Sequence, residues 1–229
     1  MPPLDLTGKR VLILGGSGEL GGRIAHELSR RGASVLLAGR DGERLKLRSD
    51  QLVPASSYMA FDLRVDDPTS FIQEVILQLG GLDGIVNAAG VVAFGPLEEL
   101  SDGALDELIV TDFSGPLRML REAIPHLEGG FWVSITGVVA EHPMGGMAAY
   151  SAVKAGLSAA TRALARELRR KKIHVLDARP PHTETGLVTR PIEGNPPALP
   201  TGLNPDQVAR RIVEGLAAGE RELASTQFA

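Results

Sequence analysis

The sequence predicts an α/β protein in which about seven parallel strands form a doubly wound sheet between two layers of helices, a three-layer α/β/α arrangement. Short apolar runs alternate with longer amphipathic stretches along the 229 residues, which is the pattern of right-handed βαβ units. Hydrophobic residues make up 43% of the chain but aromatic residues only 4%, so the core must be aliphatic, as in helices packed on a parallel sheet. No repeat or linker divides the chain, and we expect one domain over residues 1–229.

The boundaries follow from apolar periodicity and from residues that start or stop helices. Gly32 stops the first helix, and Pro68 suits a first turn. Ser101 and Asn204 are candidate N-caps, and Pro116 marks a kink or an end in a long helical region. The expected strands are 10–14, 34–38, 57–61, 82–86, 131–135 and 173–178. The expected helices are 19–31, 68–79, 101–127, 147–170 and 204–218.

Residues 181–203 form the longest irregular stretch and are rich in Pro, Gly and Thr. A loop of this length in a compact domain is more often functional than idle. We interpret it as a lid over a substrate site. The alternative is a disordered surface loop.

A glycine-rich turn separates the first expected strand from the first helix. Glycine permits the positive φ of a tight turn, and a phosphate approaches the backbone most closely where no Cβ intervenes. The helix N-terminus then offers free N–H groups to a pyrophosphate. The alternative is a turn that merely packs the helix on the strand. The residues expected to contact a dinucleotide here are Gly15, Ser17, Gly18, Leu20 and Gly21.

The end of the second expected strand bears on the choice between NAD and NADP. NAD-binding folds usually place an acid at this point to accept from the ribose 2′-OH, whereas an arginine can pair with the 2′-phosphate of NADP. The sequence has Gly39 followed by Arg40. NADP(H) is therefore favoured over NAD(H), although Asp41 is close and Arg40 could simply be solvated.

From about residue 6 to residue 187 the chain resembles the short-chain dehydrogenase/reductase family, whose members share an NAD(P)-binding Rossmann fold. The resemblance implies that the matching residues, together with Thr183, contact NAD(P). It also implies a homodimer or homotetramer formed through the helices at 101–127 and 147–170. The matches are Gly15-x-x-Gly18-x-x-Gly21, Asp62-Leu63, Asn87-Ala88-Ala89-Gly90, Tyr150-x-x-x-Lys154, Pro180 and Thr185.

Tyr150 and Lys154 are the expected catalytic pair. Four residues apart on a helix, they share one face. A phenol is a poor base near neutrality, and a nearby ammonium favours its ionised form. The resemblance implies that Tyr150 is the general acid/base and that Lys154 tunes its pKa and holds the nicotinamide ribose. The alternative is an ordinary helix-face pair.

Two positions depart from the family pattern. The family has a serine thirteen residues before the tyrosine, and Gly137 stands there. Thr136 could substitute only if the strand end shifted its register, because neighbouring side chains in a strand point to opposite faces. The family's relay asparagine aligns with Asp112. An aspartate could still hold a water, but its buried charge needs a partner.

We therefore expect an NADP(H)-dependent oxidoreductase that transfers hydride between the nicotinamide and a carbonyl or secondary alcohol. The alternative is a dinucleotide-binding regulatory protein with weak or no turnover. The net charge of −4 gives no reason to expect a nucleic acid, no apolar run is long enough for a membrane span, and the five histidines show no metal-ligand spacing. With no cysteine in the chain, we expect a cytoplasmic protein with a small-molecule substrate and no metal.

Overall fold

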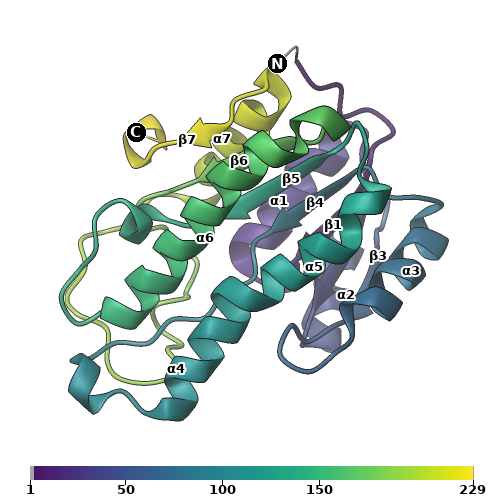
Figure 1. The fold of residues 1–229 in the computed structure, drawn as a ribbon. Coiled ribbons are helices and arrows are strands. Elements are labelled where there is room, and N and C mark those ends of the chain that lie inside the picture. Colours follow the sequence, from purple (N-terminus) through teal and green to yellow (C-terminus); the bar gives the residue numbers. More distant parts are fainter. Residues whose placement is uncertain (1–2, 229) are drawn as a thin grey trace.

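The computed structural model describes residues 3–228. A seven-stranded parallel sheet in the order β3-β2-β1-β4-β5-β6-β7 forms its centre (Figure 1). The predicted doubly wound α/β/α class is confirmed. The strands are β1 (Arg10–Leu14), β2 (Ser34–Gly39), β3 (Ser57–Ala60), β4 (Gly84–Asn87), β5 (Phe131–Ile135), β6 (His174–Ala178) and β7 (Glu222–Leu223).

Helices cover both faces of the sheet, and alternate residues of each strand pack against opposite layers. In β1, Val11 and Ile13 join the core beneath α1, α2 and α7, whereas Leu12 and Leu14 join the core beneath α3, α5 and the end of α6. Burial on both faces explains why the central strands are continuously apolar. The helices are α1 (Glu19–Arg30), α2 (Gly42–Asp50), α3 (Pro68–Leu79), α4 (Asp102–Ile109), α5 (Gly115–Ala123), α6 (Ala148–Glu167) and α7 (Pro205–Ala218).

The structure differs from the sequence prediction in three elements. Helix α2 was not expected because it is short and mostly polar, and it begins at Asp41, whose carboxylate accepts from the Arg44 N–H. Strand β7 has only two residues. The single helix expected at 101–127 is α4 and α5 joined by a π-helical turn at Val110–Ser114, with Pro116 in the first turn of α5 rather than at a break.

Residues 181–203 contain no helix or strand, but the fold holds them in place. Two isolated parallel bridges, Ala93 with Glu193 and Thr183 with Leu203, join this segment to the turn after β4 and to its own far end. The segment thus runs beside the carboxyl ends of the strands. Its description as a lid remains a prediction.

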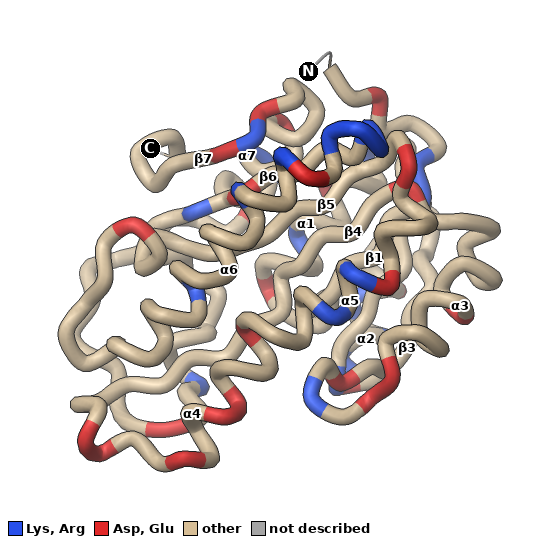
Figure 2. Tube along the Cα trace, viewed as in Figure 1, with Lys and Arg blue, Asp and Glu red and all other residues tan. Residues whose placement is uncertain are grey.

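Most charged residues lie on the surface around this core. Figure 2 shows a basic run where α6 ends, in the 3₁₀ turn Leu168–Lys171. Because α6 runs antiparallel to the strands, this run lies near their amino ends, away from the cleft described below. Within residues 3–228 no helix is long and apolar enough to cross a membrane. The same part of the chain has no group of three or more His, Cys, Asp or Glu side chains placed to hold a metal ion.

Candidate active site

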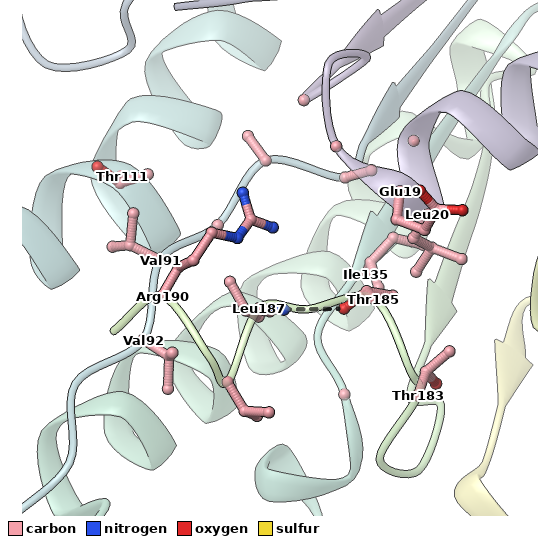
Figure 3. A pocket seen from close by; sticks show the side chains of 18 of the residues that line it. Glu19, Leu20, Val91, Val92, Thr111, Ile135, Thr183, Thr185, Leu187 and Arg190 are labelled. Atoms are coloured by element: carbon pink, nitrogen blue, oxygen red, sulfur yellow. Dashed lines mark hydrogen bonds between the residues drawn. The ribbon is translucent and has the colours of Figure 1, made fainter. Parts of the chain in front are cut away.

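A cleft of about 530 Å³ opens at the carboxyl ends of the strands. Figure 3 shows it from close by, with the side chains of some of the residues that line it. The cleft lies where the strand order reverses between β1 and β4, the usual ligand site of a doubly wound sheet. Most residues predicted for the site line it. These are Gly15, Ser17, Gly18, Leu20, Gly21, Arg40, Asp62, Leu63, Ala88, Ala89, Gly90, Thr136, Tyr150, Lys154, Pro180, Thr183 and Thr185.

The glycine turn is shaped by close backbone contacts. Gly15 has φ +77°, and a Cβ on it would lie 2.6 Å from backbone atoms of Ala88 and Ala89. A Cβ on Gly21 would lie 2.3 Å from the Gly15 carbonyl oxygen. Helix α1 begins after Gly18 without a side-chain cap, so its first N–H groups are available to a ligand. The turn therefore presents an uncapped helix N-terminus to the cleft.

Glu19 stands beside this anion-binding position and is held by two arginines. Its carboxylate pairs with Arg23 at 2.6 Å and also with Arg48 from α2. Burial opposes ionisation of Glu19, but the hydrogen bonds from both arginines outweigh it and keep the pKa below the usual value. The pairing offsets the negative charge of Glu19 beside the uncapped N-terminus of α1.

The far end of the cleft carries two arginines. Arg40 Nη1 lies 3.1 Å from Glu107 Oε1, so Arg40 is paired rather than merely solvated. Arg44, from α2, also lines the cleft. Sequence analysis missed Arg44 because it missed α2, although Asp41 followed by helix-forming residues was an available signal. Asp62 is held by Arg64 at 2.7 Å, which lowers its pKa.

Tyr150 and Lys154 lie on α6 in one wall of the cleft, as predicted. They are 9% and 5% exposed, and Lys154 Nζ lies 5.7 Å from the centroid of the Tyr150 ring. Lys154 also donates to the Ile135 carbonyl at 3.4 Å. The expected lowering of the Tyr150 pKa by Lys154 is not found. Burial, together with the charge of Asp112, raises the pKa of the phenol well above its usual value.

Burial is the larger cause of this difference, and Asp112 adds to it. Asp112 is fully buried on the π-helical turn, and its Oδ1 accepts from the Val91 N–H at 3.0 Å and lies 3.7 Å from Lys154 Nζ. Burial raises the pKa of Asp112 to about 6, and Lys154 opposes that rise. Its charge offsets that of Lys154, and its side chain lies behind the cleft wall rather than in it.

Several polar side chains at the end of β4 and on the π-helical turn are buried. Within the described residues, Asp112 Oδ2, Thr111 Oγ1 and both polar atoms of the Asn87 amide have no hydrogen-bond partner. Asn87, predicted to contact the cofactor, is fully buried at the end of β4 between Leu14 and Ser134. Its side chain is not among those that line the cleft, and its contact with the cofactor stays a prediction.

The serine position is changed in backbone as well as in side chain. Gly137 has φ +77° and ψ 165°, a region that essentially only glycine adopts. The Thr136 hydroxyl is fully buried and donates to Asp177 Oδ1 at 2.6 Å. The register shift on which a substitution by Thr136 depended is not seen, and a catalytic role for Thr136 stays a prediction.

The Asp177 contact belongs to a buried charged network that sequence analysis missed. Asp177 also accepts from Ser158 Oγ and from Arg179 Nη1, each at 2.6 Å. Arg179 pairs further with Glu141 at 2.6 Å and Glu222 at 3.0 Å. The network joins α6, β6 and β7 to the 3₁₀ turn that follows Gly137. The available signal was two charged residues at the end of an otherwise apolar strand.

The part of the cleft next to Tyr150 is apolar. Its walls come from the turns after β4 and β5, from the start of α6 and from the segment 181–203. These side chains were not predicted as site residues, because single aliphatic residues in loops carry no recognisable pattern. They are Val91, Val92, Val138, Val139, Met144, Met147, Leu187, Val188, Ile192 and Leu199.

This fold and this site define a class: α/β oxidoreductases that bind NAD(P) at the switch point of a doubly wound sheet. Comparison with known proteins supports the class. Residues 9–195 match the family model described as short chain dehydrogenase. The chain therefore belongs to the short-chain dehydrogenase/reductase family and is an oxidoreductase of that type.

Individual relatives agree with this membership. The 3-oxoacyl-[acyl-carrier-protein] reductase FabG of Escherichia coli (strain K12) is 30% identical over 190 residues, which cover 80% of this chain and 77% of the relative. A short-chain dehydrogenase from Sphingobium yanoikuyae, solved with NADPH, has a TM-score of 0.86 and 25% identity, covering 94% and 87% of the two chains. A Brucella melitensis 3-ketoacyl-(acyl-carrier-protein) reductase, solved with NADH, has a TM-score of 0.85 and 23% identity. The match covers 98% of this chain and 100% of that one, and it shows the shared fold.

Proposed function

We propose that this chain is an NADP(H)-dependent oxidoreductase that interconverts an apolar carbonyl compound and its secondary alcohol, with Tyr150 as general acid/base. One observation carries the proposal. The Tyr150–Lys154 pair lines the same cleft as the uncapped N-terminus of α1. A site for a dinucleotide phosphate and a proton-transfer group thus share one cavity.

The cleft fits a dinucleotide on two grounds. A Cβ at Gly15 would meet the Ala88–Ala89 backbone and one at Gly21 would meet the Gly15 carbonyl, so the glycines allow the tight turn that presents the first N–H groups of α1 to the cleft. The buried Thr111 hydroxyl, unpartnered within residues 3–228, lies in the cleft wall. The glycine turn would hold the pyrophosphate, and Lys154 would hold the nicotinamide ribose. When bound, the reduced dinucleotide supplies the hydride.

The protein's own part in the reaction is proton transfer and exclusion of water. In reduction, the Tyr150 hydroxyl donates its proton to the substrate oxygen; in oxidation, the phenolate takes it back. The raised pKa of Tyr150 keeps the phenol protonated over the physiological range. Reduction starts from this protonated state, but the raised pKa also makes the phenol a weaker proton donor than a free tyrosine. The apolar walls beside Tyr150 suit a hydrophobic carbonyl compound.

The preference for NADP(H) is supported by the pair Arg40 and Arg44 at the far end of the cleft. An arginine pairs well with a phosphate because its planar fork matches two oxygens. The Asp41 carboxylate accepts from the Arg44 N–H as the cap of α2. That bond competes with any role of Asp41 as an acceptor for a ribose 2′-OH.

A second candidate is a dinucleotide-binding regulatory protein with weak or no turnover. Three features favour this candidate. Gly137 lacks a hydroxyl, the Thr136 hydroxyl donates its hydrogen bond to Asp177, and Asp112 offsets the charge of Lys154. Loss of one preorganised contact to a reacting oxygen typically lowers a rate by about 10²–10³. This candidate shares the cofactor site and differs only in turnover.

Self-association is a further part of the proposal. The outer face of α6 exposes Ala152, Ala159 and Ala163, and Ile109 at the end of α4 is 38% exposed. We propose that these faces pair in a homodimer or homotetramer. Light scattering on the purified protein would test this, and a monomer at micromolar concentration would contradict it.

The experiment that tests the function has two stages. Purified protein is first titrated with NADPH and with NADH, in the wild type and in a double variant with Arg40→Gln and Arg44→Gln. We expect tighter binding of NADPH in the wild type and loss of that preference in the variant. The NADPH complex is then mixed with a panel of apolar ketones and aldehydes. Carbonyl-dependent oxidation of NADPH supports the enzyme, and tight binding without any oxidation supports the regulatory alternative.

A further inference from the structure

We propose that Arg190, on the segment 181–203, binds the pyrophosphate of the dinucleotide and thereby fastens this segment over the cofactor. The inference rests on the proposed dinucleotide site and adds a residue that no sequence motif assigns. Four features support it: the guanidinium lines the cleft, it has no acidic partner among residues 3–228, its segment is anchored by hydrogen bonds, and the uncapped N-terminus of α1 lies across the cleft.

The guanidinium of Arg190 projects into the cleft. Figure 3 shows it between Val91 on one side and Glu19 and Leu20 at the start of α1 on the other. Its Nε donates to the Gly186 carbonyl at 3.0 Å. This bond fixes the plane of the group and leaves the two terminal nitrogens to meet a ligand. An arginine fork held in this way is suited to two oxygens of one phosphate.

The charge of Arg190 is not neutralised within the protein. It forms no salt bridge with any residue between positions 3 and 228, whereas Arg40 pairs with Glu107 and Lys154 pairs with Asp112. Val91 and Leu187 are among its neighbours in the cleft (Figure 3). Arg190 is exposed at the rim of the cleft, so solvent screens part of its charge, and its attraction for an anion depends on the close approach that the cleft allows.

The segment that carries Arg190 is tied down just after it. Ile192 N–H donates to the Val92 carbonyl at 2.8 Å, and Phe94 N–H donates to the Glu193 carbonyl at 3.0 Å. The Glu193 carboxylate accepts from the Ser101 N–H at 2.8 Å and from the Ser101 hydroxyl. Arg190 is thus two residues from a fixed point, so little conformational entropy remains to be lost on binding.

The position identifies the anion. The cleft wall on the side of Glu19 and Leu20 is the uncapped N-terminus of α1, a site for phosphate. Arg190 stands on the lid side of the same space. The pyrophosphate is the anion that would lie between them, and NADPH and NADH share it. A 2′-phosphate or an anionic group on the substrate would use the same chemistry, and the experiment separates these sources.

The test compares Arg190→Gln and Arg190→Lys with the wild type, and uses Arg118→Gln as the matched control. Arg118 is an exposed arginine on α5 outside the cleft. Dissociation constants are measured for NADPH and NADH, and circular dichroism verifies that each variant is folded. Loss of a charge-assisted contact should weaken both dinucleotides by the same factor, about 10-fold or more. Arg190→Lys should recover part of the affinity, and Arg118→Gln should change nothing.

A second readout concerns the segment itself. NADPH should slow amide hydrogen exchange at residues 186–193 in the wild type but much less in Arg190→Gln. Weakening of NADPH alone would reassign Arg190 to the 2′-phosphate and overturn the proposal. Unchanged binding of both dinucleotides would also overturn it, and a raised KM for the carbonyl compound would then point to a substrate anion. If the wild type bound neither dinucleotide, the proposed function itself would fail, an outcome visible without any variant.

Discussion

Asp112 Oδ1 lies 3.7 Å from Lys154 Nζ, and both side chains are almost completely buried beside the cleft. Two opposite charges at this distance in a medium of low polarity interact strongly, but each loses its hydration. The pair therefore sets the charge around Tyr150. An ionised Asp112 raises the pKa of the phenol, whereas a protonated Asp112 leaves Lys154 as the uncompensated charge.

We expect Asp112 to make stability depend on pH. Its carboxyl has a usual pKa of 3.8, and burial raises the pKa to about 6 in the folded protein. The folded state thus binds the proton more tightly, so this group disfavours folding increasingly as pH rises from about 4 to about 6, with the full penalty above that range. Two pKa units correspond to about 3 kcal/mol. Urea unfolding of Asp112→Asn and the wild type at several pH values measures this difference.

The matched control is Asp106→Asn, an exposed aspartate on α4. Asp112→Asn should gain stability relative to the wild type on going from pH 4 to pH 7, and Asp106→Asn should not. Unfolding free energies of Asp112→Asn and the wild type that run parallel over this range would show that the pKa of Asp112 is not raised in the folded protein.

Restoring the family serine at Gly137 should harm the fold rather than repair the site. Among residues 3–228, apart from its two chain neighbours, only the Pro180 carbonyl oxygen comes within 4 Å of a Cβ there, at 3.9 Å, so space is not the obstacle. The backbone conformation is the obstacle, and a non-glycine residue in it costs about 1–3 kcal/mol. Gly137→Ser and Gly137→Ala should lower the free energy of unfolding equally. Gly145→Ser is the control. Gly145 does not have a positive φ, and a Cβ built on it would have no atom within 4 Å. A stable Gly137→Ser variant with greatly increased turnover would disprove this account.

The Thr136 hydroxyl should matter for stability and little for cofactor binding. Thr136→Val removes a donor from the buried Asp177 carboxylate, which should cost about 1–3 kcal/mol. Thr136→Ser keeps the donor and should restore most of the loss. Thermal unfolding and NADPH titration of both variants provide the measurement. If Thr136→Val were fully stable but inactive, the hydroxyl would belong to the reaction after all.

Glu107 should weaken the binding of NADPH. Its carboxylate pairs with Arg40 and Arg64, each at 3.1 Å, and competes with a phosphate for Arg40. Glu107→Gln should therefore tighten NADPH by about two- to fivefold, the scale of an exposed ion pair, and leave NADH unchanged. Equal gains for both dinucleotides would remove Arg40 from the choice of cofactor.

Features written in local sequence could be predicted from it. The central strands could be placed because burial on both faces makes them continuously apolar, and α3 because Pro68 stands in its first turn ahead of an amphipathic pattern. The glycine turn and the Tyr150–Lys154 pair follow fixed spacings. Helix α2 and the π-helical turn at Val110–Ser114 escaped because short polar helices and local changes of helix type leave weak periodicity.

The parts of the site that sequence could not supply depend on contacts between distant segments. The direction of the Thr136 hydroxyl is set by Asp177, 41 residues later. Asn87 is buried because β1 and β5 pair with β4 on either side of it. The charge of Lys154 is offset by Asp112, which lies 42 residues earlier on the π-helical turn. A spacing rule identifies residue types, but the partner that holds each side chain is fixed only by the fold.

The most direct test of the whole account is single-turnover oxidation of bound NADPH by the best carbonyl compound of the panel, in the wild type and in Tyr150→Phe. The substitution removes only the phenolic oxygen and should leave NADPH affinity within a few-fold of the wild type. We expect the oxidation rate to fall by about 10²–10⁴, the usual contribution of a general acid. Equal rates in the two proteins, with NADPH bound in both, would contradict the assignment of Tyr150 as the proton-transfer group.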